Sequence, residues 1–347
     1  MKDVKKIAFV DFRKSIIAEK YFITEYLKEF YDIEIVGLKD ADYVFYSLQG
    51  NKHWFTPERC VKIFYTEENL VPDFNACDYA IGFEWMEYED RYVRFPIYYW
   101  YPYINELMEN KHNIPVEKII SEKKAFCSIT VSNTNRDPIF SLLFDRLSEY
   151  KKVDSGGSWK NSVGVKIKSK LDFERTHKFS IVCENSSHSG YTTEKIVEAF
   201  AANCIPIYWG DPSISKVFNP RAFINVQDYS SIDDVVEIVK RLDTDNGLYE
   251  SMLMEPVLLN KCYSKEIQTI LFKKFLVSIF SQPLEKAKRR NRVLWGQLYL
   301  NERKRQVTSL TYVIREKFIL SLWRFKCLVR KYYWSLKAIY YKKESNC

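Results

Sequence analysis

The feature that most limits the fold of this chain is a series of short apolar runs separated by helix-like segments. In the first 132 residues these runs are KIAFVDF (6–12), IEIVG (33–37), DYVFYS (42–47), VKIFYT (61–66), DYAIGF (78–83) and KAFCSITVS (124–132). Nearly continuous apolar runs of this length are typical of parallel strands that are buried on both faces. Between the first two runs, one helix is predicted over residues 15–31, with Ile17, Tyr21, Leu27 and Tyr31 on one face.

A second α/β pattern follows the first. A helix is predicted over residues 138–150, and the Gly/Ser-rich stretch KKVDSGGSWKNS (151–162) is typical of a passage between domains. Then come a strand (178–183), a helix (193–203), a strand (204–209) and the helix SIDDVVEIVKRL (231–242). The sequence therefore predicts an α/β protein with two Rossmann-like domains that face a cleft, in residues 1–150 and 151–283.

The last part of the chain, residues 284–347, differs in charge from the rest. It contains 17 Lys/Arg and 4 Asp/Glu, whereas the other 283 residues contain 36 Lys/Arg and 41 Asp/Glu. Its apolar residues form a helical stripe with alternating spacings of four and three: Phe318, Leu322, Phe325, Val329, Tyr332, Leu336 and Ile339. A basic amphipathic helical tail of this kind favours contact with an anionic membrane surface. The alternatives are packing or self-association into a homo-oligomer; no nucleic-acid motif is present.

The remaining composition gives simple expectations. The eight cysteines include no CxxC pair and the four histidines are isolated, so we expect free buried thiols and no metal site. No stretch approaches about twenty apolar residues, and the first apolar run is too short for a signal peptide. We therefore expect a cytoplasmic protein that is peripheral on the inner face of the cell membrane through its tail.

The stretch ENSSHSGYTTEK (184–195) is the strongest candidate for chemistry. It lies between a predicted strand and a predicted helix, it contains Gly190, and its last residue, Lys195, places a cation in the first turn of that helix. The free N–H groups and the dipole of a helix start form an anion site, which the lysine would reinforce. A lysine that turns into solvent is the plainer interpretation, with Asn185 and Ser186 as loop caps and Tyr191 as a core residue.

A longer stretch around this motif resembles a known family. Residues 177–229, which include ENS, YTTEK and IPIYWG, closely resemble the donor-site signature of the bacterial α-1,3-fucosyltransferases. The segments FYTEENLVPDFNACDYAIGF (64–83), RYVRFPIYYWY (91–101) and SEYKKVDSGGSW (148–159) are similar to segments of the same family, in the same order. The resemblance covers roughly residues 60–260 and implies a GT-B architecture with the donor in the second domain.

What the resemblance implies is a transferase that moves L-fucose from GDP-fucose with inversion, without a cofactor or an essential metal. Lys195 would contact the donor phosphates and Glu194 a sugar hydroxyl of the nucleotide, while Tyr191 and Asn185 would complete the donor pocket. The acceptor implied is the 3-OH of GlcNAc in a Galβ1-4GlcNAc-type glycan, which gives a Lewis X-type product. A same-fold transferase for another nucleotide sugar and a non-catalytic glycan-binding or scaffold protein are the alternatives.

Inverting transfer needs a carboxylate that removes the proton of the acceptor hydroxyl. Glu68, followed by Asn69, matches the family's Glu-Asn at the proposed base position, and the rival carboxylates are Glu67, Glu84, Glu87 and Asp90.

The chain departs from the family at one donor position. Phe140 occupies the place where the family usually has a phosphate-binding arginine. We expect Arg136, four residues earlier, to replace it. Asp243-Thr244-Asp245 looks like a metal-binding D-x-D motif, but it precedes Asn-Gly, so a turn explains it better.

Overall fold

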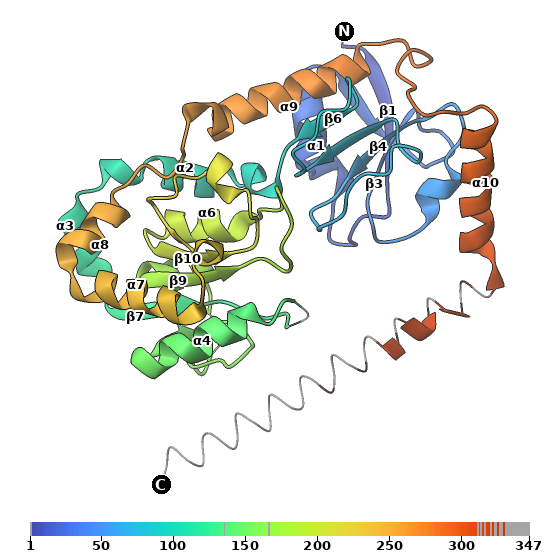
Figure 1. Cartoon of the computed structure of the whole chain (residues 1–347). Coiled ribbons are helices and arrows are strands. Elements are labelled where there is room, and N and C mark those ends of the chain that lie inside the picture. Colours follow the sequence, from blue (N-terminus) through green and yellow to red (C-terminus); the bar gives the residue numbers. More distant parts are fainter. Residues whose placement is uncertain are drawn as a thin grey trace. The chain divides into compact units, whose positions relative to one another are not determined.

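The computed structural model describes residues 2–134, 136–165 and 167–310, and residues 312, 314–315, 317–319, 321–322, 325 and 329. It contains two parallel β-sheets, each in its own compact unit (Figure 1). The first unit comprises Met1–Pro96 and Glu266–Leu320, and the second is built on Ile97–Lys265. The predicted α/β class with two parallel sheets is therefore confirmed.

The sheet of the first unit has six strands in the order β2-β1-β3-β4-β5-β6, all parallel. They are β1 (Val4–Val10), β2 (Asp32–Ile35), β3 (Tyr43–Tyr46), β4 (Val61–Tyr65), β5 (Tyr79–Gly82) and β6 (Tyr92–Arg94). Every residue of β3, β4 and β5 is buried, as the apolar runs predict. The helix predicted over 15–31 is shorter: only α1 (Phe22–Lys28) is α-helical. The Thr24 hydroxyl donates to the Ala18 carbonyl at 2.7 Å, which links α1 to the short 3-10 helix Ala18–Lys20 that precedes it.

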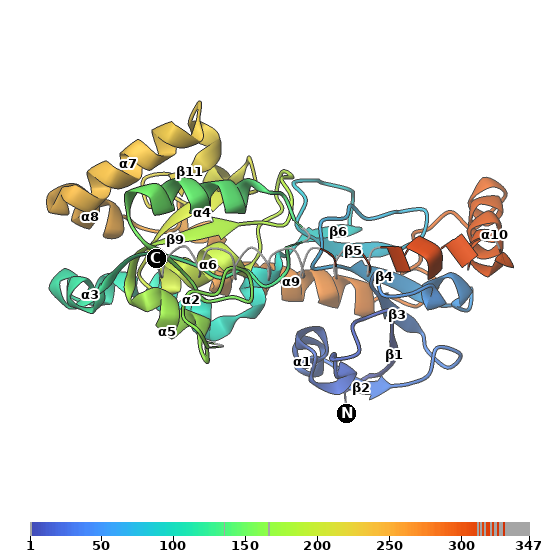
Figure 2. The same cartoon turned by 90° about the horizontal axis from the view of Figure 1, so that it is seen from below.

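The sheet of the second unit has five parallel strands in the order β11-β10-β9-β7-β8. They are β7 (Ala125–Ile129), β8 (Val153–Ser155), β9 (His177–Cys183), β10 (Ile205–Trp209) and β11 (Ile224–Asn225). Helices α2 and α6 cover one face of this sheet, and α4 and α7 cover the other (Figures 1 and 2). The helices of this unit are α2 (Pro102–Glu109), α3 (Val116–Glu122), α4 (Ile139–Tyr150), α5 (Lys170–Arg175), α6 (Glu194–Ala201), α7 (Ile232–Thr244) and α8 (Asn246–Leu253).

The predicted domain boundary at residue 150 was too late. Strand β7 and helix α4 precede that residue, yet β7 pairs with both β8 and β9 in the second sheet. The Gly/Ser cluster at 151–162 is not a linker between domains. A Cβ on Gly157 would lie 2.0 Å from the Val131 carbonyl oxygen, so this glycine allows two backbone segments of one unit to touch.

The chain returns to the first unit after the second, which the predicted boundary at 283 did not anticipate. Helix α9 spans Lys265–Phe280. Its buried Phe272 stacks on Phe95 with 4.2 Å between ring centroids, and Phe280 stacks on Tyr43 at 4.1 Å. These contacts explain why residues from Glu266 onward belong with the first sheet.

Residues 284–309 are also part of the first unit and do not form a separate tail. Arg290 makes an ion pair with the buried Asp78 at 3.0 Å, and α10 (Trp295–Thr308) packs beside the 3-10 helix Lys52–Phe55. Of the predicted apolar stripe, Phe318, Leu322, Phe325 and Val329 are described and exposed. Tyr332, Leu336 and Ile339 lie outside the described residues.

Short 3-10 helices complete the secondary structure: Ala18–Lys20, Lys52–Phe55, Ile97–Trp100, Lys111–Asn113, Ile214–Lys216, Val226–Asp228 and Lys261–Tyr263. The six cysteines in the described ranges are free thiols, as predicted, and five of them are buried, but Cys262 is exposed. Among the described residues, no helix combines the length and the apolar character needed to cross a membrane.

Candidate active site

The loop between β9 and α6 is shaped by one buried carboxylate, Asp211. Its oxygens accept hydrogen bonds from the Gly190 backbone N–H at 2.8 Å and from the Thr192 hydroxyl at 2.9 Å. Asp211 also accepts from the Ser213 backbone N–H at 2.7 Å, so it ties this loop to the loop after β10. Gly190 adopts a φ of 86°, a conformation that residues with side chains rarely take. The loop therefore has a defined path at the carboxyl ends of two neighbouring strands.

The cation at the start of α6 has a partner that the sequence analysis missed. The Lys195 ammonium donates to the Glu184 carboxylate at 2.7 Å and to the Thr193 hydroxyl at 2.7 Å. Glu184 has a fully buried side chain and also accepts the Thr193 backbone N–H at 2.8 Å. The Lys195 side chain keeps 19% of its surface exposed. The positive charge at this helix start is thus balanced on one side and accessible on the other.

Arg136 lines the same small pocket as Lys195, together with Thr130, Phe140 and Lys170. Its guanidinium donates to the Cys183 carbonyl at 3.3 Å, and its buried Nε has no hydrogen-bond acceptor among the described residues. Burial lowers the pKa of this guanidinium, because a charge loses hydration there. An anion in the pocket would stabilise the charged guanidinium and so offset its loss of hydration.

Phe140 belongs to the core. Its ring is buried and meets the Trp159 ring edge-on, with 4.8 Å between centroids, while the Arg136 guanidinium carbon lies 5.9 Å from the Phe140 ring centre. The structure therefore brings Arg136 and Lys195 into one pocket, as the substitution hypothesis requires.

The other predicted donor residues lie on the same loop. The Asn185 carbonyl accepts the Asp137 backbone N–H at 3.0 Å, and its buried Oδ1 has no hydrogen-bond partner in the described part of the chain. Glu194 is the first residue of α6. Tyr191 is buried, so its ring contributes to the core of this unit.

The predicted base lies in the first unit, beside a pocket at the carboxyl ends of β1, β3 and β4. Arg13, Tyr21, Glu67 and Glu68 are among its lining residues. Arg13 donates to the Glu68 carboxylate at 2.5 Å, which orients it, while Tyr21 donates to Glu67 at 3.4 Å. The Glu68 side chain is 43% exposed and that of Glu67 21%. Glu68 is therefore the more accessible of the two carboxylates.

The other rival carboxylates do not line this pocket. Glu84 is buried and Glu87 is exposed elsewhere on the loop after β5. Asp90 is held by Arg289, whose Nε donates to it at 2.9 Å. These hydrogen bonds keep the pKa of Asp90 below its ordinary value, so Asp90 is better explained as part of a structural ion pair.

The D-x-D sequence has structural partners. Asp243 accepts hydrogen bonds from Lys178 at 2.9 Å and from Lys151 at 3.0 Å. Asp245 caps α8 by accepting the Leu248 backbone N–H at 3.0 Å. Ion pairing and helix capping account for both carboxylates.

Glu184, Asp211 and Arg13 are the residues of these two sites that the sequence analysis missed. A signal for Glu184 was present, because a carboxylate directly after a largely buried strand needs a cation or several N–H donors. The neighbouring Gly210 supports this reasoning, since a Cβ there would lie 2.5 Å from Glu184 Cγ. For Arg13 the sequence held no comparable signal.

Two family models match the chain. The Alpha-(1,3)-fucosyltransferase FucT N-terminal domain matches residues 7–101, and the C-terminal model of glycosyltransferase family 10 (fucosyltransferase) matches residues 120–254. Alpha-(1,3)-fucosyltransferase FucT of Helicobacter pylori is 36% identical over 246 residues, which are 62% of this chain and 51% of the relative. The chain thus spans about half the length of this relative. Human 4-galactosyl-N-acetylglucosaminide 3-alpha-L-fucosyltransferase 9 is 32% identical over 139 residues, 39% of this chain and 38% of the relative.

Solved structures agree with these matches. A crystal structure of an alpha1,3-fucosyltransferase with GDP-fucose has a TM-score of 0.66 at 29% identity and covers 80% of this chain and 91% of its own. Another crystal structure of an alpha1,3-fucosyltransferase has a TM-score of 0.70 at 27% identity and covers 84% of this chain and 93% of its own. The predicted GT-B type of fold is confirmed by these similarities.

Proposed function

The chain belongs to glycosyltransferase family 10, the α-1,3-fucosyltransferases, and we propose that it transfers L-fucose from GDP-fucose to a glycan hydroxyl. The observation that supports this most directly is the pocket shared by Arg136 and Lys195 at the start of α6. A structural neighbour with 29% identity was solved with GDP-fucose, which has a diphosphate of the kind this pocket suits.

On the donor side, Lys195 and Arg136 bind the diphosphate and stabilise its charge. When the bond between fucose C1 and the GDP oxygen breaks, negative charge gathers on the leaving phosphate. Two fixed cations and the N–H groups at the start of α6 offset that charge without a metal ion. In this proposal Asn185 and Glu194 contact the nucleotide sugar, and the buried Tyr191 supports the donor loop from the core.

On the acceptor side, Glu68 is the general base. Its carboxylate accepts the proton of the acceptor hydroxyl while the oxygen attacks fucose C1 on the face opposite the leaving GDP, which inverts that carbon. Arg13 holds the carboxylate in position through their 2.5 Å contact.

The acceptor we propose is the 3-OH of GlcNAc in a Galβ1-4GlcNAc-type glycan. The support is the printed name of the human relative, a 4-galactosyl-N-acetylglucosaminide 3-alpha-L-fucosyltransferase, together with the H. pylori α-(1,3)-fucosyltransferase. We also propose that the part of residues 284–347 that follows Leu310 attaches the enzyme to the cytoplasmic face of a membrane rich in anionic lipid. The surplus of basic residues and the exposed Phe318, Leu322 and Phe325 support this.

The test is GDP release from GDP-fucose with N-acetyllactosamine in the presence of EDTA. We expect turnover that does not need metal and that falls at least a hundredfold in Lys195→Ala, since each lost charge contact in a transition state costs about a hundredfold to a thousandfold. Lys240→Ala, which removes a half-buried lysine on α7 that pairs with Glu237, is the matched control and should keep full activity. Turnover of another nucleotide sugar in place of GDP-fucose, or no turnover of any donor, would contradict the proposal.

A further inference from the structure

A second basic pocket lies in the first unit, away from the candidate active site. Its lining includes Trp54, Lys62, Arg290, Arg292 and Lys304. These residues come from the start of β4, from the adjacent 3-10 helix and from the C-terminal segment that returns to this unit.

The pocket does not overlap the site around Glu68. Lys62 is the second residue of β4, whereas Glu68 follows the end of that strand. The two pockets have no lining residue in common. They therefore belong to opposite ends of the same sheet.

Lys62 is a buried amine whose Nζ has no carboxylate bonded to it. Only 1% of the residue is exposed, and its ammonium has no hydrogen bond or ion pair to any residue that the structure describes. Its nearest partners are the rings of Tyr46 and Trp54, whose centroids lie 5.1 and 5.4 Å from Nζ. Burial, followed by the repulsion of Arg290, lowers the pKa of Lys62 to about 7. A buried charge that lacks a partner is costly and rare in a folded protein.

The one carboxylate nearby, Asp78, is already shared. It forms ion pairs with Arg290 at 3.0 Å and with Arg292 at 3.5 Å, and it accepts three backbone N–H groups, including that of Lys62 at 2.7 Å. The buried Nε of Arg292 has no hydrogen-bond acceptor among the described residues. Positive charge therefore exceeds negative charge around the pocket.

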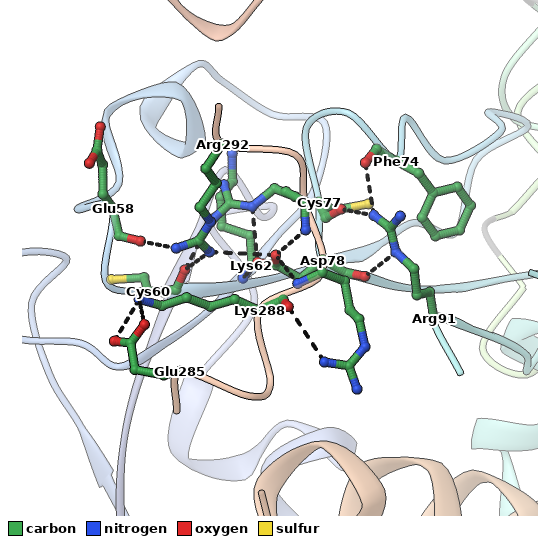
Figure 3. Close-up of polar contacts among 12 residues, drawn as sticks. Glu58, Cys60, Lys62, Phe74, Cys77, Asp78, Arg91, Glu285, Lys288 and Arg292 are labelled. Carbon is green, nitrogen blue, oxygen red and sulfur yellow. Dashed lines mark hydrogen bonds and ion pairs between the residues drawn. The ribbon is translucent and has the colours of Figure 1, made fainter. Parts of the chain in front are cut away.

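The other acidic residues of this region do not compensate. Glu58 also lines the pocket, where its backbone carbonyl accepts from Arg292, while its carboxylate points away from the Arg292 guanidinium (Figure 3). Glu285 is paired with Lys288 at 2.8 Å (Figure 3). The remaining positive charge around the pocket favours an external anion with several oxygens.

We propose that this pocket binds a phosphate group, held by Lys62, Arg292 and Lys304, as a site separate from the donor site. Fixed guanidinium groups match the oxygens of phosphate, and a lysine adds a mobile charge-assisted hydrogen bond. The phosphate could belong to a soluble phosphorylated compound or to a lipid headgroup. Both present the same chemistry to these side chains.

The test is calorimetric titration of inorganic pyrophosphate into the full chain, alone and with one equivalent of GDP, which occupies the candidate donor site without saturating a second phosphate site. We expect wild-type protein to bind and Lys62→Met to bind at least tenfold more weakly, since a charge-assisted hydrogen bond is lost. Lys52→Met removes an exposed lysine that does not line the pocket and should bind like wild type. Methionine is one atom shorter than lysine and carries no charge, so Lys62→Met should unfold at or above the wild-type temperature. Lys304→Ala, at the half-buried rim, gives a second weakened variant that does not disturb the core.

A parallel arm distinguishes the two sources of phosphate. Vesicles that contain phosphatidic acid are compared with neutral phosphatidylcholine vesicles for the same variants, each also without the residues after Leu310, so that membrane binding by those residues does not hide a loss at the pocket. Binding to phosphatidic acid but not to pyrophosphate, with the same loss in Lys62→Met, assigns a lipid headgroup to the pocket. Equal binding by Lys62→Met and Lys52→Met, or no binding of either probe by wild type, overturns the proposal.

Discussion

Two lysine–glutamate pairs in the second unit have the same length and differ in burial. Lys195–Glu184 and Lys240–Glu237 are both 2.7 Å long. The Glu184 side chain is fully buried, whereas that of Glu237 is 66% exposed. Replacing each glutamate by glutamine keeps the size of the side chain and removes its charge, so the two substitutions compare the same bond in two environments.

The expected cost follows from the hydrogen bonds of each carboxylate. A glutamine at 184 can keep its oxygen on the Thr193 backbone N–H, but its NH2 group then faces the Lys195 ammonium, and two donors cannot bond. The loss of one charge-assisted hydrogen bond in a buried site lowers the free energy of unfolding by about 2 kcal/mol. A surface pair one helical turn apart contributes only about 0.3 kcal/mol.

Urea denaturation of wild type, Glu184→Gln and Glu237→Gln, followed by circular dichroism, measures this difference. We expect the transition midpoint to fall clearly in Glu184→Gln and to stay near wild type in Glu237→Gln. GDP-fucose affinity should fall with it, because Lys195 loses the contact that positions it. If both variants have the same midpoint, Glu184 does not organise the start of α6, and the reasoning fails.

Three further outcomes are expected. Arg136→Ala should lower fucose transfer at least tenfold while Arg146→Ala, an exposed arginine on α4, should not; unchanged kinetics in both would remove Arg136 from the donor site. Burial lowers the pKa of Lys62 to about 7, so unfolding takes up a proton between about pH 7 and 10, and stability should rise with pH across this range. In urea denaturation, the free energy of unfolding of Lys62→Met should increase less with pH than that of wild type. An equal increase in both proteins would contradict this prediction. Removal of the residues after Leu310 should abolish binding to anionic vesicles and leave turnover unchanged, whereas removal of those after Leu284 should unfold the first unit. Vesicle binding by the chain that ends at Leu310 would refute the membrane proposal.

The strand and helix on either side of the donor loop could be predicted because neighbouring residues in the sequence determine them. The strand predicted over 178–183 is β9 at 177–183, and the helix predicted over 193–203 is α6 at 194–201. Apolar periodicity and one glycine are sufficient for such an element pair. The partner of Lys195 was not predictable in the same way, since the distance between residues 184 and 195 depends on the path of the loop. That path depends on Asp211, sixteen residues beyond the lysine.

The predicted domain boundaries were wrong for a related reason. Periodicity predicts that β7 is a strand, but it does not say which sheet the strand joins. The same holds for α9, whose buried Phe272 and Phe280 would suit the core of either unit. Glycines at 156 and 157 indicated a linker, yet they are needed where backbone and side chains of one unit approach closely. Only tertiary contacts distinguish these cases.

The position of Lys195 can be explained by the number of hydrogens on its ammonium. A lysine ammonium has three donors, and two of them are directed to Glu184 and Thr193 at 2.7 Å. The third remains for a ligand in the pocket that Lys195 shares with Arg136. The buried Glu184 carboxylate therefore orients the Lys195 ammonium while taking up only one of its three N–H donors. It follows that Lys195→Ala removes the proposed phosphate contact and also leaves Glu184 buried without its cation, which is destabilising by itself. A loss of turnover in that variant measures the proposed chemistry only when the remaining folded fraction is measured at the same temperature.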